Sequence, residues 1–203
     1  MIISSGLARL FAISGPPFPK HKHGPVKMGR LKVFIGGRIV TKNLKEIENV
    51  SINGEITSAH GIWDLSAQKN TNLILEIAKE VEDTKCITSS DALDALRLSV
   101  GLSTQSGTAS AFDFIAADFN QDGKITSGDA LEILKFSVGL EGGSLPEWVF
   151  LKSDIAVGAV TKNDVSYESA ATFYVGETDA TIGLVGVLIG DVNGSYDPTT
   201  ILM

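Results

Sequence analysis

Residues 118–140 read DFNQDGKITSGDALEILKFSVGL, and an earlier stretch, residues 87–102, reads ITSSDALDALRLSVGL. The earlier stretch matches residues 125–140 at most positions, at an offset of 38 residues. Two of the differences preserve charge. Chance does not produce a match of this length, so the chain contains a duplicated structural unit.

Both copies carry apolar residues at helical spacing. The i, i+3, i+4 pattern predicts one helix in each copy, with a single apolar stripe on each helix. The stripes comprise Ala92, Leu93, Leu96 and Val100 in the first copy and Ala130, Leu131, Leu134 and Val138 in the second. Gly101 and Gly139 are placed to end the helices as C′ residues. Because neither helix can bury its stripe alone, we expect the two helices to pack on each other through these faces.

The loop before the second copy has the spacing of a calcium-binding loop. Residues 118–129 place oxygen-bearing side chains at loop positions 1, 3, 5, 9 and 12, with Gly123 at position 6. Calcium takes six to eight oxygens at about 2.3–2.6 Å, and a twelve-residue loop delivers them by turning alternate residues inward. The predicted ligands are Asp118, Asn120, Asp122, Lys124 through its backbone carbonyl, Thr126 and Asp129. An Asx-rich turn that only caps the following helix is the alternative interpretation.

The loop before the first copy has lost most of this pattern. Its positions 1, 3, 5 and 6 hold Glu80, Glu82, Thr84 and Lys85. Only Thr88 and Asp91 keep a residue type suited to a ligand, and a lysine replaces the glycine. We therefore predict one calcium site, in the second copy, and a metal-free first loop in which Asp91 is a helix N-cap.

A third polar segment lies near the end of the chain. Residues 191–197, DVNGSYD, imitate the first half of a calcium loop, but position 6 is not glycine and Leu202 stands where an acid belongs. We interpret this segment as a polar turn after a strand, with a partial calcium site as the alternative.

Short runs rich in β-branched and aromatic residues flank the repeats and predict strands. They are residues 32–40, 47–52, 62–65 and 72–77 before the repeats, and residues 147–152, 166–175 and 180–189 after them. The run LILEIAKEV, residues 73–81, is also compatible with a helix. The sequence thus predicts an α+β protein, a small β-sandwich-like layer with an inserted pair of calcium-loop–helix repeats. The expected divisions are a flexible tail at 1–25, a β segment at 26–82, the repeat pair at 83–143 and a β segment at 144–203 that is a candidate to complete the sandwich.

Composition narrows the classes of function. The net charge of −7 argues against a nucleic-acid partner, whose phosphates would repel the surface. No run reaches the roughly 18 apolar residues of a membrane span. The single cysteine, Cys86, excludes an internal disulfide. The sequence has no nucleophile motif, phosphate loop or zinc spacing, so we predict that the protein is not an enzyme.

The stretches DFNQDGKITSGDALEILKF and ITSSDALDALRL resemble the type I dockerin family, over about residues 80–141. This resemblance implies a pseudo-twofold pair of calcium-loop–helix units that docks onto a cohesin β-sandwich. The positions by which the family reads its partner fall on Ser89, Ser90, Arg97, Ser127, Gly128 and Lys135. More loosely, the flanks, including GVLIGDVNGSYD, resemble segments of large secreted bacterial proteins in which a dockerin-like pair follows a carboxypeptidase-regulatory-like sandwich.

Together these features predict a calcium-binding, protein-binding module of an extracellular or cell-surface bacterial protein. The start of the chain lacks a convincing signal peptide, since Arg9 interrupts its apolar stretch. One alternative is a purely structural role, with calcium stapling a segment of an adhesin-like protein. Another is an accessory module of a polysaccharide-degrading system, in which Trp63 or Trp148 would stack on sugar rings.

Overall fold

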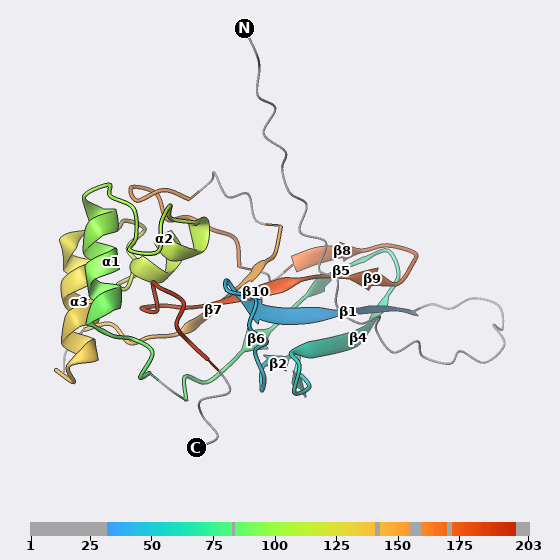
Figure 1. Cartoon of the computed structure of the whole chain (residues 1–203). Coiled ribbons are helices and arrows are strands. Elements are labelled where there is room, and N and C mark those ends of the chain that lie inside the picture. The colour runs from blue at the N-terminus through green and yellow to red at the C-terminus, as the bar shows by residue number, and fades with distance from the viewer. Residues whose placement is uncertain (1–31, 83, 141–142, 155–159, 170–171, 198–203) are drawn as a thin grey trace, which may run out of the picture. The chain divides into compact units, whose positions relative to one another are not determined.

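The computed structural model describes residues 32–82, 84–140, 143–154, 160–169 and 172–197 (Figure 1). The predicted tail at residues 1–25 lies outside these ranges. The strands before the helices are β1 (Lys32–Thr41), β2 (Ser51–Ile52), β3 (Glu55–Ile56), β4 (Ile62–Gln68), β5 (Thr71–Ile74) and β6 (Ile77–Ala78). Helices α1 (Ser89–Ser99), α2 (Ala111–Ala117) and α3 (Ser127–Ser137) follow. The later strands are β7 (Trp148–Lys152), β8 (Thr172–Val175), β9 (Ala180–Thr181) and β10 (Leu184–Leu188).

The main sheet joins strands from both sides of the helical insert. Its order is β4-β1-β10-β7, and β9 also pairs with β1. β1 runs parallel to β10, with Ile39 opposite Leu184, and antiparallel to β4. Two smaller ladders, β3-β2-β6 and β5-β8, complete the β structure of the described residues. The α+β prediction is confirmed, and the long-range pairing of β1 with β10 brings the two β stretches together.

Several strand boundaries differ from the sequence prediction. Within 47–52 only Ser51–Ile52 forms a strand, and within 166–175 the strand is Thr172–Val175. The run 73–81 contributes to β5 and β6, so its alternative interpretation as a helix is wrong. β2 pairs with β6, and β5 pairs with β8. These pairings decide where the short strands begin and end, and a single sequence does not reveal such partners.

The first and third helices begin with the same hydrogen-bonded cap. Thr88 and Thr126 are the N-cap residues, and each forms a capping box with the aspartate three residues later. Asp91 is therefore the N3 residue of α1 and not its N-cap, which corrects the prediction. Both helices end at a glycine of positive φ, Gly101 and Gly139, as predicted.

The two helices lie side by side, as expected, but not through the predicted faces (Figure 1). The predicted stripe residues Leu93, Leu96, Val100, Leu131, Leu134 and Val138 are all exposed, between 41% and 64% of their surface. The buried residues are Asp91, Ala92, Asp94, Ala95 and Leu98 in α1 and Asp129, Ala130 and Ile133 in α3. Of each predicted stripe only the alanine is buried, so the assignment of these leucines and valines to the core is wrong.

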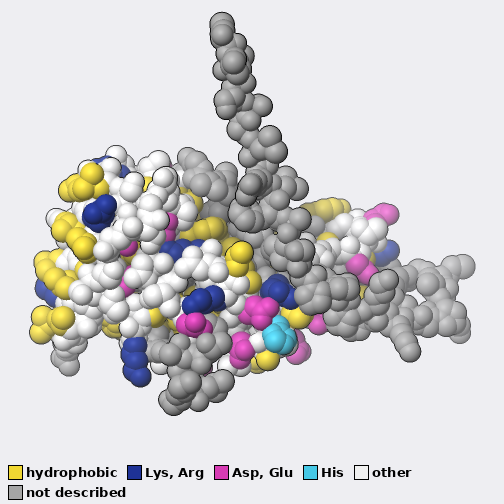
Figure 2. Space-filling model, viewed as in Figure 1, with side chains coloured by type: hydrophobic (Ala, Val, Ile, Leu, Met, Phe, Trp, Pro, Cys, Tyr) yellow, Lys and Arg dark blue, Asp and Glu magenta, His cyan; other side chains and the backbone are white. Residues whose placement is uncertain are grey.

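Small side chains explain why the inner faces differ from the prediction. Ala92, Ala95 and Ala130 allow the helices to approach closely, and Ile115 of α2 is buried in the same core cluster. No sequence pattern predicted α2. Because the alanine-bearing faces pack in this cluster, with α1 in contact with both α2 and α3, the leucine stripes remain outside, where Figure 2 shows apolar side chains gathered over α1 and α3.

The helices are attached to the sheet by a shared core. Residues of α1, α2 and α3 pack in one cluster with Val185, Val187 and Leu188 of β10. The backbone N–H of Gly190 donates to the Ala116 carbonyl at 2.8 Å, which joins the end of β10 to α2. Among the described residues, no helix has the length and apolar character to cross a membrane.

Candidate calcium site

The loop at 118–129 has the turns that a twelve-residue calcium loop needs. It starts where α2 ends, with Asp118 as the C-cap residue of that helix. Gln121 and Gly123 adopt positive φ values of 56° and 86°, so the chain reverses direction twice within six residues. The loop ends in the first turn of α3, where Asp129 is the N3 residue.

The two carboxylates at the ends of the loop are turned inward. Asp129 is fully buried and Asp118 is 3% exposed. Asp118 accepts hydrogen bonds from the backbone N–H groups of Asp122 at 3.1 Å and Gly123 at 2.9 Å. Asp129 accepts from the backbone N–H of Asn120 at 3.3 Å. These bonds link position 1 to positions 5 and 6, and position 12 to position 3.

The electrostatics of the loop favour a cation. The pKa of Asp118 is raised to about 6, mainly by burial and also by the charges of Asp129 and Asp122, against the opposing effect of hydrogen bonds from the backbone of Gly123 and Asp122. The charges of Asp122 and Asp129 thus disfavour the ionised form of Asp118, and a bound divalent cation would oppose that effect. The donor set therefore fits calcium, a hard cation that takes oxygen ligands.

The remaining predicted ligands lie on the same loop. Asn120, Asp122, Lys124 and Thr126 are exposed, and the Asp122 carboxylate accepts from the N–H of Lys124 at 3.0 Å. The Thr126 hydroxyl donates to Asp129 at 3.0 Å as part of the capping box. Within the described residues, no three Asp, Glu, His or Cys side chains form a metal-binding group by themselves. A calcium ligand set at this loop therefore has to include amide, hydroxyl or backbone oxygens.

The loop is braced by a segment that the sequence analysis did not connect with it. Ile125, at loop position 8, is buried as expected, and its backbone N–H donates to the Lys162 carbonyl at 2.8 Å. The N–H of Val165 donates to the Gly123 carbonyl at 2.9 Å. These bonds attach the loop to residues beyond β7, so the support for the site comes from outside the repeats.

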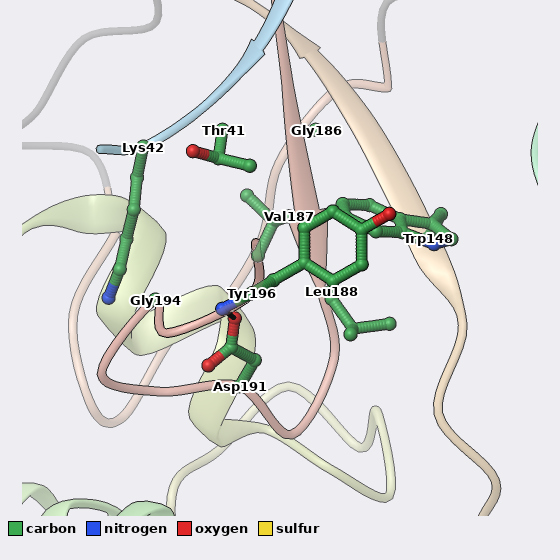
Figure 3. A pocket seen from close by; sticks show the side chains of 9 residues that line it. All are labelled: Thr41, Lys42, Trp148, Gly186, Val187, Leu188, Asp191, Gly194 and Tyr196. Carbon is green, nitrogen blue, oxygen red and sulfur yellow. Dashed lines mark hydrogen bonds between the residues drawn. The ribbon is translucent and has the colours of Figure 1, made fainter. Parts of the chain in front are cut away.

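The first repeat is likewise in contact with a distant segment. Asp91 is fully buried and accepts a hydrogen bond from the backbone N–H of Asn193 at 2.9 Å. Asp191 accepts hydrogen bonds from the backbone N–H groups of Ser195 and Tyr196. Figure 3 shows the Asp191 side chain next to Tyr196. Burial raises the pKa of Asp91 and of Asp191, and the charge of Asp91 raises that of Asp191 further. The sequence signal for this contact was the D-x-N-x-S spacing of 191–195, interpreted above as a polar turn.

The residues at the partner-reading positions divide into two groups. Ser89, Ser127 and Gly128 are exposed at the starts of α1 and α3. Ser90 instead accepts a hydrogen bond from the Gln105 side chain at 3.0 Å, and Arg97 donates to the Ser103 carbonyl at 2.7 Å. Lys135, which aligns with Arg97 in the repeat, is half-buried on α3.

The tryptophans lie in packed surroundings. Trp63 is 5% exposed within the core of the sheet. Trp148 packs edge-on against Tyr196, with ring centroids 4.8 Å apart, and stacks on Phe150 at 6.2 Å. Stacking of Trp63 on a sugar would need a ring face that the sheet core already covers.

Comparison with known families assigns the repeat region. Residues 89–136 match the family model of the dockerin type I domain. Dockerins of this type bind calcium and dock onto cohesin domains. The resemblance drawn from the sequence is therefore confirmed for the repeats, and calcium is the metal that such domains bind. No curated protein and no solved structure matches the chain, and nothing found supports a carboxypeptidase-regulatory-like sandwich in the flanks. We refer to residues 89–136 as the dockerin-like pair.

Proposed function

We propose that this chain is a non-catalytic module of an extracellular or cell-surface protein, in which calcium orders the dockerin-like pair for binding to a cohesin-like domain. The calcium ligands in this proposal are Asp118, Asn120, Asp122, the Lys124 carbonyl, Thr126 and Asp129. The observation that carries the proposal is the combination of an inward-turned loop with an exposed apolar surface on the two helices that follow the repeat loops.

The exposed stripes of α1 and α3 form the partner surface in this proposal. Leucine and valine side chains lie at matching positions of the two copies, and those of α3 include Leu131 at 51% and Val138 at 62% exposure. A continuous apolar surface on a folded protein marks an interaction site more often than chance exposure does. Ser89, Ser127 and Gly128 adjoin this surface at the helix starts, where a partner could form polar contacts around an apolar centre.

Calcium would act on this surface through the start of α3. Asp129 belongs to both the ligand set and the capping box, so an ion bound to it would hold the first turn of the helix that carries Leu131 and Leu134. Three formal charges place the expected dissociation constant on the order of 10⁻⁵–10⁻³ M, by comparison with EF-hand sites.

Two experiments test the proposal. Calorimetric titration of calcium should show a site that Asp122→Ala removes, and equal heats from both proteins would refute the ligand assignment. A pull-down against a panel of cohesin domains should capture the calcium-loaded chain. Leu134→Asp should abolish the capture, whereas Ile56→Asp, at an exposed position on β3, should not.

A structural role for calcium is the second candidate function. It is favoured by the internal engagement of Arg97 with Ser103 and of Ser90 with Gln105, which occupies two of the predicted partner-reading residues. In this case calcium would stabilise the fold of a surface protein without any docking. Failure of every cohesin domain to bind, together with a calcium-dependent rise in melting temperature, would favour this role.

A further inference from the structure

We infer that the chain has a second calcium site, assembled from the first repeat and the carboxy-terminal turn. The turn, residues 191–196, supplies loop positions 1, 3 and 5, and residues 86–91 supply positions 7, 9 and 12. We call this arrangement the split loop and residues 118–129 the continuous loop. The split loop lies beyond the proposed function, which assigns one ion to the continuous loop.

The register of the split loop follows from the repeat. Aligning Ile87 with Ile125 places the Cys86 carbonyl at position 7, Thr88 at position 9 and Asp91 at position 12. Asp191, Asn193 and Ser195 then take the places of Asp118, Asn120 and Asp122. The ligand types of this set are therefore carboxylate, amide, hydroxyl, carbonyl, hydroxyl and carboxylate, all of them oxygen donors that suit calcium.

The hydrogen bonds of the two loops correspond from position to position. The N–H of position 3 donates to the carboxylate of position 12, at 2.9 Å for Asn193 to Asp91 and at 3.3 Å for Asn120 to Asp129. This bond in the split loop joins residues that are 102 positions apart. A polar turn that met the helix by accident would have no reason to reproduce it.

The bonds around position 1 correspond as well. The N–H of position 5 donates to Asp191 at 2.8 Å, as it does to Asp118 at 3.1 Å. The N–H of position 6 donates to Asp191 at 3.0 Å, as it does to Asp118 at 2.9 Å. Both loops also have a residue of positive φ at position 4, with 70° at Gly194 and 56° at Gln121. The turn thus has the backbone path of a calcium loop without the glycine at position 6.

One buried oxygen in the split loop indicates that a cation binds there. Oδ1 of Asn193 is shielded from solvent and has no hydrogen-bond partner among the described residues. A buried acceptor left without a partner costs about 1–3 kcal/mol. The neighbouring Ser195 hydroxyl lies 3.0 Å from the Cys86 carbonyl, so oxygens of positions 5 and 7 already adjoin one another across the two segments. A calcium ion between them would give Asn193 Oδ1 its partner.

The turn is held in place from the sheet. Lys42 donates to the Val192 carbonyl and pairs with Asp113 of α2. Asn43 donates to the Gly194 carbonyl at 2.8 Å. These residues follow β1, so contacts with the sheet and with α2 help to hold the turn against α1. Figure 3 shows Lys42 directed toward the turn that carries Asp191 and Gly194.

Counting bound calcium on the full chain tests the inference. Native mass spectrometry with calcium as the only added metal should find two ions on the wild type. Asn193→Ala removes the unpartnered oxygen and should leave one ion, and the matched variant Asn120→Ala should also leave one. Ser195→Ala, at an exposed position, should weaken the split loop at least about tenfold, since even outer-shell changes at metal sites cost 10–100-fold.

The outcomes separate the two sites. One ion on the wild type that Asn193→Ala retains and Asn120→Ala removes would overturn the split loop and leave the proposed function standing. One ion that only Asn193→Ala removes would support the split loop and overturn the continuous one. Circular dichroism of Asn193→Ala without calcium should match the wild type, because the side-chain oxygen that it removes has no hydrogen-bond partner among the described residues.

Discussion

The continuous and split loops show two ways in which one chain can build the same hydrogen-bonded frame. In the continuous loop every candidate ligand comes from twelve successive residues, and backbone hydrogen bonds with Lys162 and Val165 brace the loop from outside. In the split loop the two halves belong to segments about a hundred residues apart, and the fold of the sheet and α2 has to bring them together. The order of the candidate ligands is therefore local in the continuous loop, whereas in the split loop it exists only through tertiary structure.

The continuous and split loops also differ in the number of charged candidate ligands. The continuous loop has carboxylates at positions 1, 5 and 12, whereas the split loop has a serine, Ser195, at position 5. Lys42 also lies near Asp191 and opposes the rise in its pKa. Calcium affinity in such loops depends on the number of charged ligands and the rigidity of the site. We therefore expect the split loop to be the weaker site.

Removal of calcium should have the largest effect on stability. At a free calcium concentration one hundred times the dissociation constant, each site contributes about 2.7 kcal/mol to the free energy of unfolding. Chelation should therefore lower that free energy by about 5 kcal/mol if both loops are filled. Urea denaturation with calcium and with a chelator measures the difference. A loss of half this size would mean that only one loop binds.

Alanine at position 12 should have the next largest effect, and it compares the two loops directly. Asp91→Ala and Asp129→Ala each remove a buried carboxylate and a capping box, which should cost about 1–2 kcal/mol without calcium. With calcium present each variant should lose the contribution of one site in addition. Denaturation of both variants under both conditions would measure this, and a calcium-independent loss for Asp91→Ala would contradict the split loop.

An exchange of residues at position 5 should then reverse the order of affinity. Ser195→Asp adds the third carboxylate to the split loop, and Asp122→Ser removes it from the continuous loop. We expect shifts in dissociation constant of about tenfold in opposite directions, since affinity follows the charge count of the ligands. Calorimetry on each single variant measures the shifts. Equal affinities before and after the exchange would show that charge at position 5 does not distinguish the sites.

Acidification should give the smallest effect. Because the pKa of Asp118 in the folded chain, about 6, lies above its ordinary value of 3.8, its buried charge destabilises the metal-free protein above pH 6 and this cost disappears as the pH falls below 6. Protons then compete with calcium for the carboxylate. The rise in melting temperature on adding calcium should be smaller at pH 5 than at pH 7.5, measured by calorimetric scans. A rise of the same size at both pH values would contradict a ligand role for Asp118.

The sequence by itself determined the features that depend on neighbours along the chain. The repeat predicted α1 and α3, their terminal glycines and the loop at 118–129, because caps and ligand spacing act within about a dozen residues. The β-rich runs that flank the repeats predicted the α+β class, because strand patterns are also local. The family match over residues 89–136 agrees with the motif that the sequence displayed.

Only the tertiary structure decided which faces and segments meet. The sequence predicted the leucine stripes to be core, but α1 packs with α2 and α3 while the stripes stay exposed. Periodicity does not tell which of two apolar faces finds a partner. The DVNGSYD segment forms the turn that the sequence predicted, but only the tertiary structure sets it against Asp91, through the pairing of β1 with β10 and the bond from Lys42. Contacts between residues so far apart depend on the closure of the whole sheet, which no local pattern encodes.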